Sequence, residues 1–581
     1  MKVNRRPLES IENKAHFDAV VIGGGINGIA TYRDLALQGL KVLLVEKDDF
    51  CSKASAAPSR MIHGGLRYLE NAEFDLVKES LYERNRLLEN APHCVHPLRT
   101  HIPLTSISKG ITSAALRFLG FERPTSERGA LIVKLGLGLY DLFTRHDQVL
   151  PPHRILSHKA TETRWPQFSQ EVKYCANYYD AWISAPERLA IELVKEANAL
   201  QGNTHALNYV HAQLLPDGEI QLMDTISSHQ ICVTTTQLIN ATGAWIDKVN
   251  QQGGHPTSYL SNTKGSHIIV DHPELLAALK GDMVYYENQE NRVCIMFPYL
   301  GKVLIGSTDI PVSEPDSIYC TPEEVAYIIE SVSFIFPGIS IEPSDILYQF
   351  SGIRPLGTAS KATAGQIPRS HQIREDKLAD GRLSSYSLVG GKWTTFRAFA
   401  EQVTDKVLES LGKPRLRSTQ SLRIGGGKNF PESAQEHSDY LDRLSAQPFA
   451  SRPMVERLLT RYGTECEAML SAMTSPEKAL STLPQYTEQE LIYLIENEYV
   501  HHPLDLIQRR TSIAIEGLIS DASLCEIITL MADTLDWDDQ TKMQMHQATI
   551  DCLNFYNGLQ LTPTEALTDT YPQLARNALC I

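Results

Sequence analysis

Three clusters of polar residues, each next to glycine, carry side chains suited to binding an anion. The first holds His63, Arg67 and Tyr68 around Gly64-Gly65; the second holds Arg354 and Arg369, in Ser351-Gly-Ile-Arg-Pro355 and Ile367-Pro-Arg369; the third is Val389-Gly-Gly-Lys-Trp-Thr-Thr395. Histidine, arginine, lysine and tyrosine supply hydrogen-bond donors, and glycines that lead into a helix leave its first N–H groups free for an anion. A polar loop and a well-capped helix start would contain the same residues. Both interpretations therefore remain open from these clusters alone.

A glycine-rich turn near the N-terminus predicts a dinucleotide-binding βαβ unit. The apolar run 19–22 is typical of a buried strand, Gly23, Gly25 and Gly28 open a helix, and a second strand at 41–45 ends at Glu46. The first glycine permits the tight turn, the second lets a phosphate approach the backbone, and the third lets helix and strand pack closely. Glu46 stands where a carboxylate accepts the ribose hydroxyls, which argues against NADP. This unit does not separate NAD from FAD.

Composition bounds the class of protein. A chain of 581 residues predicts two to four domains. The formal charge of −15 disfavours a nucleic-acid partner. Ten cysteines without a C-x-x-C pair indicate neither a zinc site nor a disulfide framework, so a reducing compartment fits best. Residues 1–16 mix both charge signs, which is unlike a signal peptide, and we expect them to form a loose arm.

The rest of the chain supplies elements that would hold these residues. An apolar strand at 237–240 runs into Ala241-Thr-Gly243, which indicates a second approach of the backbone to a cofactor or a plain strand-to-turn junction. Strand-rich segments follow between 260 and 309. Thr321 with Pro322 and Glu324 predicts the capped start of a helix that stops before Pro337-Gly338. From Gly425 onward the pattern is helical. The acidic run 533–539 is not a calcium loop, because Thr541 and Gln547 replace the required Gly and Glu.

Residues 109–145 are unusually apolar and are flanked by arginine and lysine. The run is too short to span a bilayer. It predicts either a buried core helix or a helix lying in a membrane interface, where basic flanks suit anionic lipid.

Taken together, the motifs resemble one family, the FAD-dependent respiratory-type glycerol-3-phosphate dehydrogenases. The motifs that carry the resemblance are Ile22-Gly-Gly-Gly-Ile-Asn-Gly28, Ile62-His-Gly-Gly-Leu-Arg-Tyr-Leu69, Asn240-Ala-Thr-Gly243, Lys264-Gly-Ser-His267, Gly306-Ser-Thr-Asp309, Ser351-Gly-Ile-Arg-Pro355, Gly390-Gly-Lys-Trp-Thr-Thr395 and Gln508-Arg-Arg-Thr511. They occur in the family's order and cover the chain from about residue 17.

The resemblance implies an α/β fold: a Rossmann-like FAD-binding domain with an inserted mixed β-sheet and helix substrate domain, plus an all-α C-terminal domain. We expect an oxidoreductase region at 17–424, with FAD-binding parts at about 17–75, 150–258 and 350–415 and substrate or cap parts at about 76–149 and 259–349, followed by a helical domain at 425–581. The cofactor-binding residues implied are Gly23, Gly24, Gly25, Asn27, Gly28, Glu46, Ser59, Thr242, Gly243, Gly390, Gly391, Thr394 and Thr395.

The implied reaction is oxidation of sn-glycerol 3-phosphate to dihydroxyacetone phosphate by hydride transfer to flavin. The implied catalytic residues are His63, His267 and Arg354, and the implied substrate-binding residues are Arg67, Tyr68, Arg369 and Lys392, with Arg369 and Lys392 the better choices for the phosphate; no metal is implied. Electrons would pass to a quinone, from a cytoplasmic protein attached peripherally to the inner face of the cell membrane. A homodimer is left open.

Three alternatives remain. The same fold can pass electrons to oxygen, as a glycerol-3-phosphate oxidase. A related flavin amine or amino-acid oxidase would lack the dense Arg and Lys set between 354 and 392. A non-catalytic flavin-holding sensor or scaffold would need no grip on a phosphate.

Overall fold

A six-stranded sheet forms the centre of the computed structural model, which describes residues 8–71, 73–106, 130–200, 204–288, 292–316, 318–358 and 370–562. Its strands, in spatial order, are β19 (Gln372–Leu378), β20 (Leu383–Val389), β12 (Gln237–Asn240), β2 (Ala19–Ile22), β3 (Val42–Val45) and β8 (Thr204–Leu207). All neighbours pair in parallel except β19 with β20. Every residue of β2 and β3 is buried, as apolar runs in a parallel sheet should be.

Each face of this sheet is covered. Helices α1 (Ile26–Leu37), α6 (Pro186–Ala199) and α10 (Phe396–Leu411) share one hydrophobic core with it. A four-stranded sheet shares the core on the other face; it contains β1 (Ala15–Phe17), β11 (Gln230–Thr235), β10 (Ile220–Asp224) and β9 (Val210–Leu214). The expected loose N-terminal arm is wrong for residues 8–16, because Leu8 and Ile11 are buried in this core and β1 pairs with β11, while residues 1–7 lie outside the described residues.

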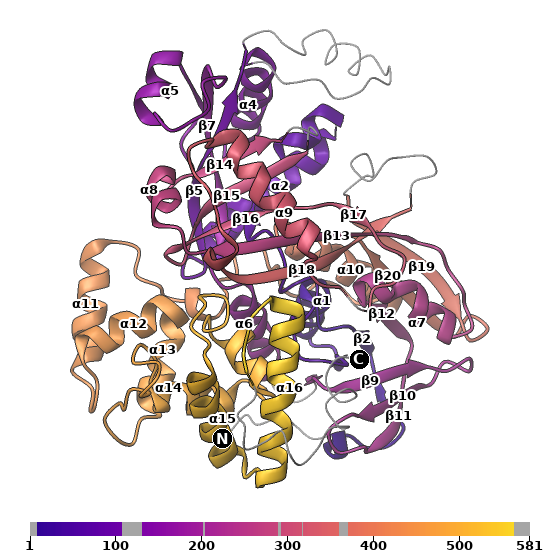
Figure 1. Cartoon of the computed structure of the whole chain (residues 1–581). Helices are drawn as coiled ribbons and strands as arrows, with labels where there is room; N and C mark the ends of the chain where they lie inside the picture. Colours follow the sequence, from indigo (N-terminus) through magenta and orange to yellow (C-terminus); the bar gives the residue numbers. More distant parts are fainter. Residues whose placement is uncertain are drawn as a thin grey trace.

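A second, ten-stranded sheet occupies the upper part of Figure 1. Its strands are β17 (Ile310–Pro311), β13 (Leu260–Val270), β16 (Lys302–Gly306), β15 (Val293–Tyr299), β14 (Met283–Glu287), β5 (Val95–Leu104), β7 (Tyr174–Ile183) and β4 (Met61–Ile62), with β18 (Ile346–Gly357) paired to β13 and β6 (Arg154–Leu156) paired to β7. Helices α8 (Pro273–Leu279) and α9 (Pro322–Ile335) pack on it. The capping box predicted at Thr321 and Glu324 is confirmed.

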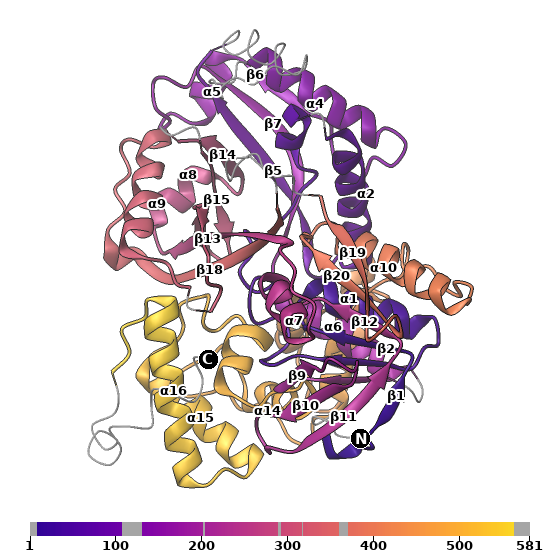
Figure 2. The same ribbon diagram turned by 90° about the vertical axis from the view of Figure 1, so that its right-hand side faces the viewer.

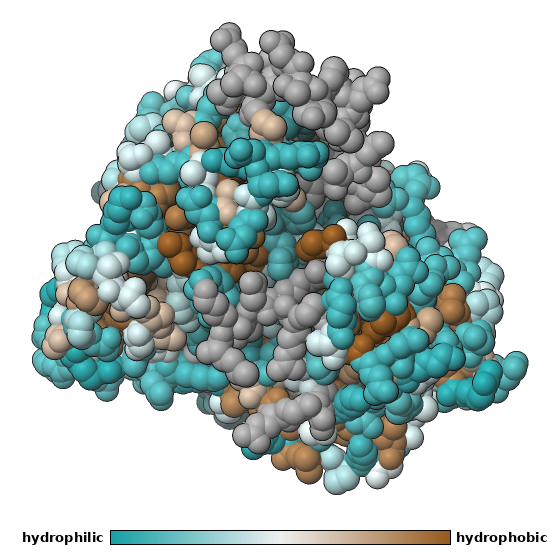
Figure 3. Space-filling model, turned by 90° about the horizontal axis from the view of Figure 1, so that it is seen from below, coloured by the Kyte–Doolittle hydropathy of each residue, from teal (hydrophilic) through white to brown (hydrophobic). Residues whose placement is uncertain are grey.

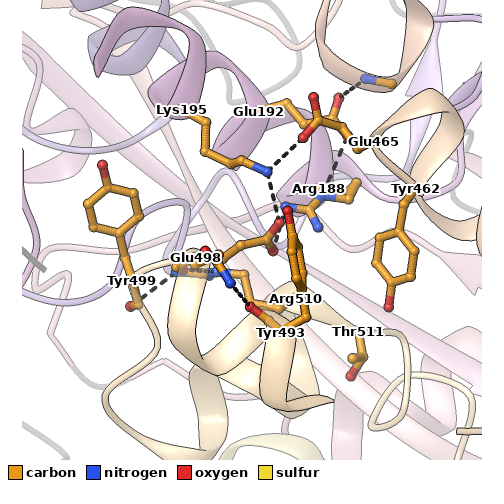
Figure 4. A network of polar contacts seen from close by, with 12 residues as sticks. Arg188, Glu192, Lys195, Tyr462, Glu465, Tyr493, Glu498, Tyr499, Arg510 and Thr511 are labelled. Carbon is orange, nitrogen blue, oxygen red and sulfur yellow. Dashed lines mark hydrogen bonds and ion pairs between the residues drawn. The ribbon is translucent and has the colours of Figure 1, made fainter. Parts of the chain in front are cut away.

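The C-terminal part is helical, as predicted, and lies below the large sheet in Figures 1 and 2. It contains α11 (Ala434–Ser445), α12 (Arg452–Tyr462), α13 (Cys466–Ser471), α14 (Glu488–Asn497), a π-helical turn η8 (Asp505–Arg510), α15 (Asp521–Leu535) and α16 (Asp539–Asn557). Buried ion pairs join it to α6: Glu498 accepts hydrogen bonds from Arg188 at 2.7 Å and from Lys195 at 3.2 Å (Figure 4).

Helix α4 (Ala130–Thr144) has one buried and one exposed apolar face; the earlier part of the apolar segment, 109–129, lies outside the described residues, and the membrane interpretation stays a prediction. Val133, Leu137 and Tyr140 pack in a core with α2 (Phe74–Asn90). Leu131, Leu135 and Leu142 are 53%, 70% and 56% exposed. In the described ranges no helix is long and apolar enough to cross a bilayer. The face seen from below in Figure 3, opposite the end that carries α4, is mainly hydrophilic.

Candidate active site

The carboxyl ends of four parallel strands bring most of the predicted cofactor-binding residues to one edge of the central sheet. Ile22 pairs with Val45 and with Asn240, and Asn240 pairs with Ser387. The segments that leave these strands therefore lie side by side: Gly23–Gly28 after β2, Glu46 after β3, Thr242 and Gly243 after β12, and Gly390 and Gly391 after β20. In open parallel sheets this edge is where ligands bind.

The glycine turn has the close packing that its spacing predicts. Gly23 has φ +108°, and a Cβ there would lie 2.5 Å from the Ala241 carbonyl oxygen. A Cβ at Gly28 would lie 2.0 Å from the Gly23 carbonyl oxygen. Gly25 begins α1 and has no side chain to cap it; the Ile26 N–H instead donates to Ser55 Oγ at 3.0 Å. The first N–H group of the helix is thus bound by the loop of Ser55.

Glu46 stands against this turn. One carboxylate oxygen accepts from the Gly24 N–H at 2.6 Å, and the other accepts from the Asp48 N–H at 3.0 Å. Burial, helped by the charge of Asp48, raises the pKa of Glu46 to about 6. The two backbone N–H groups stabilise the ionised form of Glu46, although burial opposes it. The carboxylate lies at the edge of the sheet where an adenosine ribose would bring its hydroxyls.

The start of α10 meets the start of α1. Asn27 donates from Nδ2 to the Gly390 carbonyl at 3.2 Å, and a Cβ on Gly391 would lie 2.3 Å from the same nitrogen. Trp393 donates from Nε1 to the Ser55 carbonyl at 2.9 Å. Ser55 therefore contacts both helix starts, a role that its sequence position did not reveal. Predicted Ser59 lies in the same loop and is half-buried.

Lys392, Tyr68 and His63 form one group beside this junction. The ammonium of Lys392 lies 4.0 Å above the Tyr68 ring, and the His63 and Tyr68 rings are 6.3 Å apart. The His63 N–H donates to Thr394 Oγ1 at 3.2 Å. Lys392 Nζ is buried and has no hydrogen-bond partner among the described residues. A desolvated cation of this kind is a strong binding site for an anion.

His267 and Arg354 lie on paired strands of the large sheet. A Cβ on Gly306 would lie 2.2 Å from the His267 ring, and one on Gly265 would lie 2.1 Å from the Arg354 guanidinium, so both side chains lie across glycines. Arg354 donates to the Thr308 carbonyl at 3.2 Å, to Asp309 at 3.1 Å and to Ser307 at 3.1 Å. Burial, with Arg354 and Arg60 nearby, lowers the pKa of His267 to about 3.

Three contacts join this pair of strands to the edge of the central sheet. A Cβ on Gly352 of β18 would lie 2.9 Å from the Ala57 methyl, in the loop of Ser55. Asn262 of β13 donates to the Ala244 carbonyl at 3.3 Å. A Cβ on Gly390 would lie 4.0 Å from the Pro355 carbonyl oxygen. The predicted catalytic and cofactor-binding residues thus surround a common region.

Two predicted residues fall outside what the structure describes. Arg369 lies in the undescribed range 359–369, and Arg67 lies on the 3₁₀ turn η2 (Leu66–Asn71) with its side chain outside the described set. Their roles stay predictions.

Two buried carboxylates near these residues, Glu324 and Asp180, have tertiary roles that the sequence did not reveal. Glu324 does more than cap α9: it pairs with Lys264 at 2.7 Å and accepts from Ser266 and Thr308, which hold β13 beside the Gly306–Asp309 turn. Asp180 of β7 contacts the backbone at Gly64. From the sequence, Glu324 is explained by its capping pattern, so its contacts with β13 are not expected. The contact of Asp180 with Gly64 arises only when distant segments pack together.

The arrangement fits an adenine dinucleotide that carries a redox ring. Its adenosine end has a glycine turn, the start of α1 and the carboxylate of Glu46. A Cβ on Gly243 (φ +58°) would meet no atom of the described residues within 4 Å, so a ligand can approach the backbone there. Several buried polar atoms at the other end have no hydrogen-bond partner in the described part: Asn27 Oδ1, Lys392 Nζ, Thr395 Oγ1 and both ring nitrogens of His267. Leaving such groups unpaired is costly, which favours a polar ligand there.

The described residues contain no group of three His, Cys, Asp or Glu side chains that could hold a metal ion.

Known proteins match this chain along most of its length. The family model described as FAD dependent oxidoreductase matches residues 18–405, and that described as C-terminal domain of alpha-glycerophosphate oxidase matches residues 417–542. The chain is 33% identical to a glycerol-3-phosphate dehydrogenase of Synechocystis, over 90% of this chain and 94% of that protein. It is 27% identical to an aerobic glycerol-3-phosphate dehydrogenase of Staphylococcus aureus, over 90% and 91%.

A solved structure shares the fold. The glycerol-3-phosphate dehydrogenase of Bacillus halodurans, determined in complex with FAD, superposes with a TM-score of 0.70 at 23% identity, covering 93% of this chain and 95% of that one.

Proposed function

The chain belongs to the family of FAD-dependent glycerol-3-phosphate dehydrogenases, and on that basis we propose that it oxidises sn-glycerol 3-phosphate to dihydroxyacetone phosphate with FAD as its cofactor. The single observation that best supports this substrate is the buried ammonium of Lys392, which has no hydrogen-bond partner among the described residues and lies beside the predicted catalytic His63. Glu79 interacts with this ammonium electrostatically, and a phosphate would supply the hydrogen-bonded anion that it lacks.

The residues divide between holding the cofactor and holding the substrate. FAD, when bound, supplies the acceptor for the hydride that leaves C2 of the substrate. The α1 start and Glu46 would hold its adenosine and pyrophosphate half. Lys392 would bind the substrate phosphate together with Arg67, Tyr68 and Arg369. Arg354, fixed by Ser307, Thr308 and Asp309, would stabilise negative charge that develops on the substrate oxygen.

The two histidines are suited to different tasks. With a pKa of about 3, His267 would cost roughly 5 kcal/mol to protonate at pH 7, so it would remain neutral and accept a hydrogen bond from the substrate hydroxyl. A histidine with so low a pKa is a weak base, so His63 is the better choice for the group that removes the hydroxyl proton. Its amide is anchored to Thr394, which fixes the backbone from which the ring projects.

Steady-state turnover with a soluble electron-accepting dye under nitrogen tests the proposed substrate. We expect glycerol 3-phosphate to be oxidised, and glycerol, which lacks the phosphate, to show a kcat/KM lower by about 30- to 5,000-fold, since a buried charge pair contributes roughly 2–5 kcal/mol. Comparable values for the two compounds would contradict the phosphate site.

The affinity for FAD should depend on the ionisation of Glu46. Because the pKa of Glu46 is about 6, its carboxylate accepts ribose hydroxyls fully above about pH 7 and is progressively protonated below pH 6. We expect the dissociation constant of FAD to be constant above pH 7 and to rise by up to about tenfold per pH unit below pH 6. Fluorescence titration of the apoprotein measures it. Glu46→Gln, which does not titrate, should bind FAD more weakly but without this pH dependence; the same slope in both proteins would exclude Glu46.

The electron acceptor is proposed to be a membrane quinone. The alternative is oxygen, which the oxidase name of the C-terminal family model keeps open. Turnover in air without dye, followed by hydrogen peroxide production, separates them: a quinone-linked enzyme forms little peroxide, whereas an oxidase forms one equivalent per substrate.

We further propose that α4 is the peripheral membrane contact. Its exposed Leu131, Leu135 and Leu142 are accompanied in the sequence by exposed, basic Lys134 and Arg145. Helix α5 (His158–Arg164), at the same end of the molecule in Figures 1 and 2, contributes Lys159 and Arg164 to an open cavity of about 610 Å³ that Lys280 also lines. Apolar side chains beside cations suit an anionic lipid surface.

Replacing Leu131, Leu135 and Leu142 together by serine should release the protein from membranes and spare dye-linked activity. Each leucine that enters an apolar phase contributes about 1.5–3 kcal/mol, so partitioning should fall more than a hundredfold. Leu137 is unsuitable for this test because it is buried in the core. The matched control replaces exposed Ile226 and Leu416, which lie elsewhere, by serine. If sedimentation with membranes is the same for all three proteins, α4 is not the contact.

A further inference from the structure

The turn that carries His63 is held from a second side by side chains that neither its motif nor the proposed reaction assigns. The Gly64 N–H, one residue after His63, donates to the hydroxyl of Tyr140 at 2.8 Å and to Asp180 Oδ1 at 3.1 Å. Tyr140 itself donates to Asp180 Oδ1 at 2.5 Å. Arg84 of α2 donates to the same oxygen at 3.0 Å. Three elements, α2, α4 and β7, therefore meet at one backbone amide.

This group is closed to solvent and tightly packed around Gly64. Tyr140, Asp180 and Arg84 are 3%, 1% and 2% exposed. A Cβ on Gly64 would lie 2.4 Å from the Tyr140 hydroxyl and 2.4 Å from Leu81, so only glycine fits here. Burial and the adjacent Asp180 raise the pKa of Tyr140 well above its usual value, so the phenol keeps its proton.

The Gly64 amide, held by Tyr140 and Asp180, lies in the sequence between His63 and Tyr68, the residues that would contact the substrate. On one side of it the His63 N–H is fixed by Thr394. On the other side Gly65 has φ +75° and its carbonyl accepts from the Tyr68 N–H at 2.8 Å, which places the Tyr68 ring under Lys392. A Cβ on Gly65 would lie 2.2 Å from that ring. The path of the chain through Gly64 thus sets the positions of both His63 and Tyr68.

We propose that Tyr140, together with Asp180, is a positioning residue for the oxidation: by fixing the Gly64 amide it aims His63 at the substrate hydroxyl and holds Tyr68 against Lys392. Tyr140 acts through the backbone and does not itself touch substrate or cofactor. This inference rests on the proposed function, since it assigns His63 its role in that reaction.

Rapid anaerobic mixing of Tyr140→Phe holoenzyme with sn-glycerol 3-phosphate tests the proposal. Phenylalanine keeps the ring and removes only the hydroxyl. Because a misplacement of about 1 Å can cost roughly a hundredfold in rate, we expect the limiting rate of flavin bleaching to fall about 10- to 100-fold, with flavin content and melting temperature nearly unchanged. A limiting rate within twofold of that of the wild-type protein would overturn the proposal.

Tyr178→Phe is the matched control. Tyr178 is buried in the same core, with its ring 5.8 Å from that of Tyr140, and the Gly64 amide donates to Tyr140 and Asp180 rather than to it. It should bleach at the wild-type rate. An equal loss in both variants would mean that general packing, and not the hydrogen bonds of Tyr140 and Asp180 to the Gly64 amide, sets the rate, which also overturns the proposal.

A double-mutant cycle with His63→Asn separates positioning from a structural effect. If Tyr140 acts through His63, Tyr140→Phe should lower the bleaching rate by less than threefold in the His63→Asn background. The full 10- to 100-fold loss in that background would show that Tyr140 acts by another route. Failure of the wild-type protein to bleach would instead contradict the proposed function, so the two failures are distinguishable.

Discussion

Lys392→Met is expected to lower kcat/KM for glycerol 3-phosphate by about a thousandfold while the protein keeps its flavin. Lys392 Nζ is buried above the Tyr68 ring and has no hydrogen-bond partner in the described part of the chain. In the complex it would pair with the substrate phosphate away from water, where loss of one partner of such a pair costs roughly 2–5 kcal/mol. Methionine keeps much of the volume and removes the charge. Dye-linked steady-state kinetics, with flavin content measured by absorbance, gives the result.

The control for this prediction is Lys406→Met on α10, the helix that begins shortly after Lys392. Lys406 is 42% exposed and pairs with Glu375 on the surface. Its loss should change kcat/KM by less than twofold, because exposed pairs contribute little. An unchanged kcat/KM in Lys392→Met would remove Lys392 from the phosphate site and leave Arg67 and Arg369 as the remaining candidates.

Asp49→Ala is expected to destabilise the protein by about 3–5 kcal/mol, because buried Arg510 would lose its carboxylate partner, whereas Arg509 would keep Asp505. Asp49 is fully buried between Arg509, at 2.5 Å, and Arg510, at 2.8 Å, and it also accepts from Asn208 at 3.0 Å. Arg510 continues into the network of Figure 4 through the Glu498 carbonyl. Asp49 thus joins the helical C-terminal part to the loop that follows Glu46, and flavin should be lost with it. Chemical denaturation measures the change.

The same carboxylate should make stability depend on pH at the acid end. Burial opposes ionisation, but Arg510 and Arg509 outweigh it and hold the pKa of Asp49 below its usual range. A carboxyl whose pKa is depressed in the folded state stabilises the protein above its unfolded-state pKa of about 4, and that contribution is lost as pH falls further. Asp49→Ala should remove this part of the acid sensitivity. Asp533→Ala, an exposed position on α15, is the control and should stay within about 0.5 kcal/mol of the wild-type protein.

Features determined by local sequence were the ones that could be predicted. The βαβ unit, the strand that ends at Asn240 and the capping box at Thr321 each depend on a few adjacent residues, and the structure confirms them. The overall class, an α/β fold with a helical C-terminal part, was implied by the resemblance to a known family, and the structure and the family models confirm it. The loose arm was wrong because only tertiary pairing of β1 with β11 reveals the order of residues 8–16.

Contacts between distant segments could not be predicted. Ser55 accepts hydrogen bonds from Ile26 and Trp393, and Tyr140 accepts one from Gly64, 76 residues away. No local sequence pattern predicts these contacts. Helix α4 has a face in the core and a face of exposed leucines. From the sequence, a buried helix and an interfacial helix were treated as alternatives, so a helix with both faces was not predicted. The division into cofactor and substrate parts stays a prediction; β18, which crosses residue 350, pairs with β13 in the large sheet.

Anaerobic addition of sn-glycerol 3-phosphate to the purified holoenzyme tests the central claim most directly. The proposed function predicts an oxidised flavin spectrum that bleaches on mixing, with one dihydroxyacetone phosphate formed per flavin reduced. It further predicts that glycerol at the same concentration leaves the spectrum unchanged on that timescale. A flavin that stays oxidised in the presence of glycerol 3-phosphate would contradict the assignment of this chain's substrate.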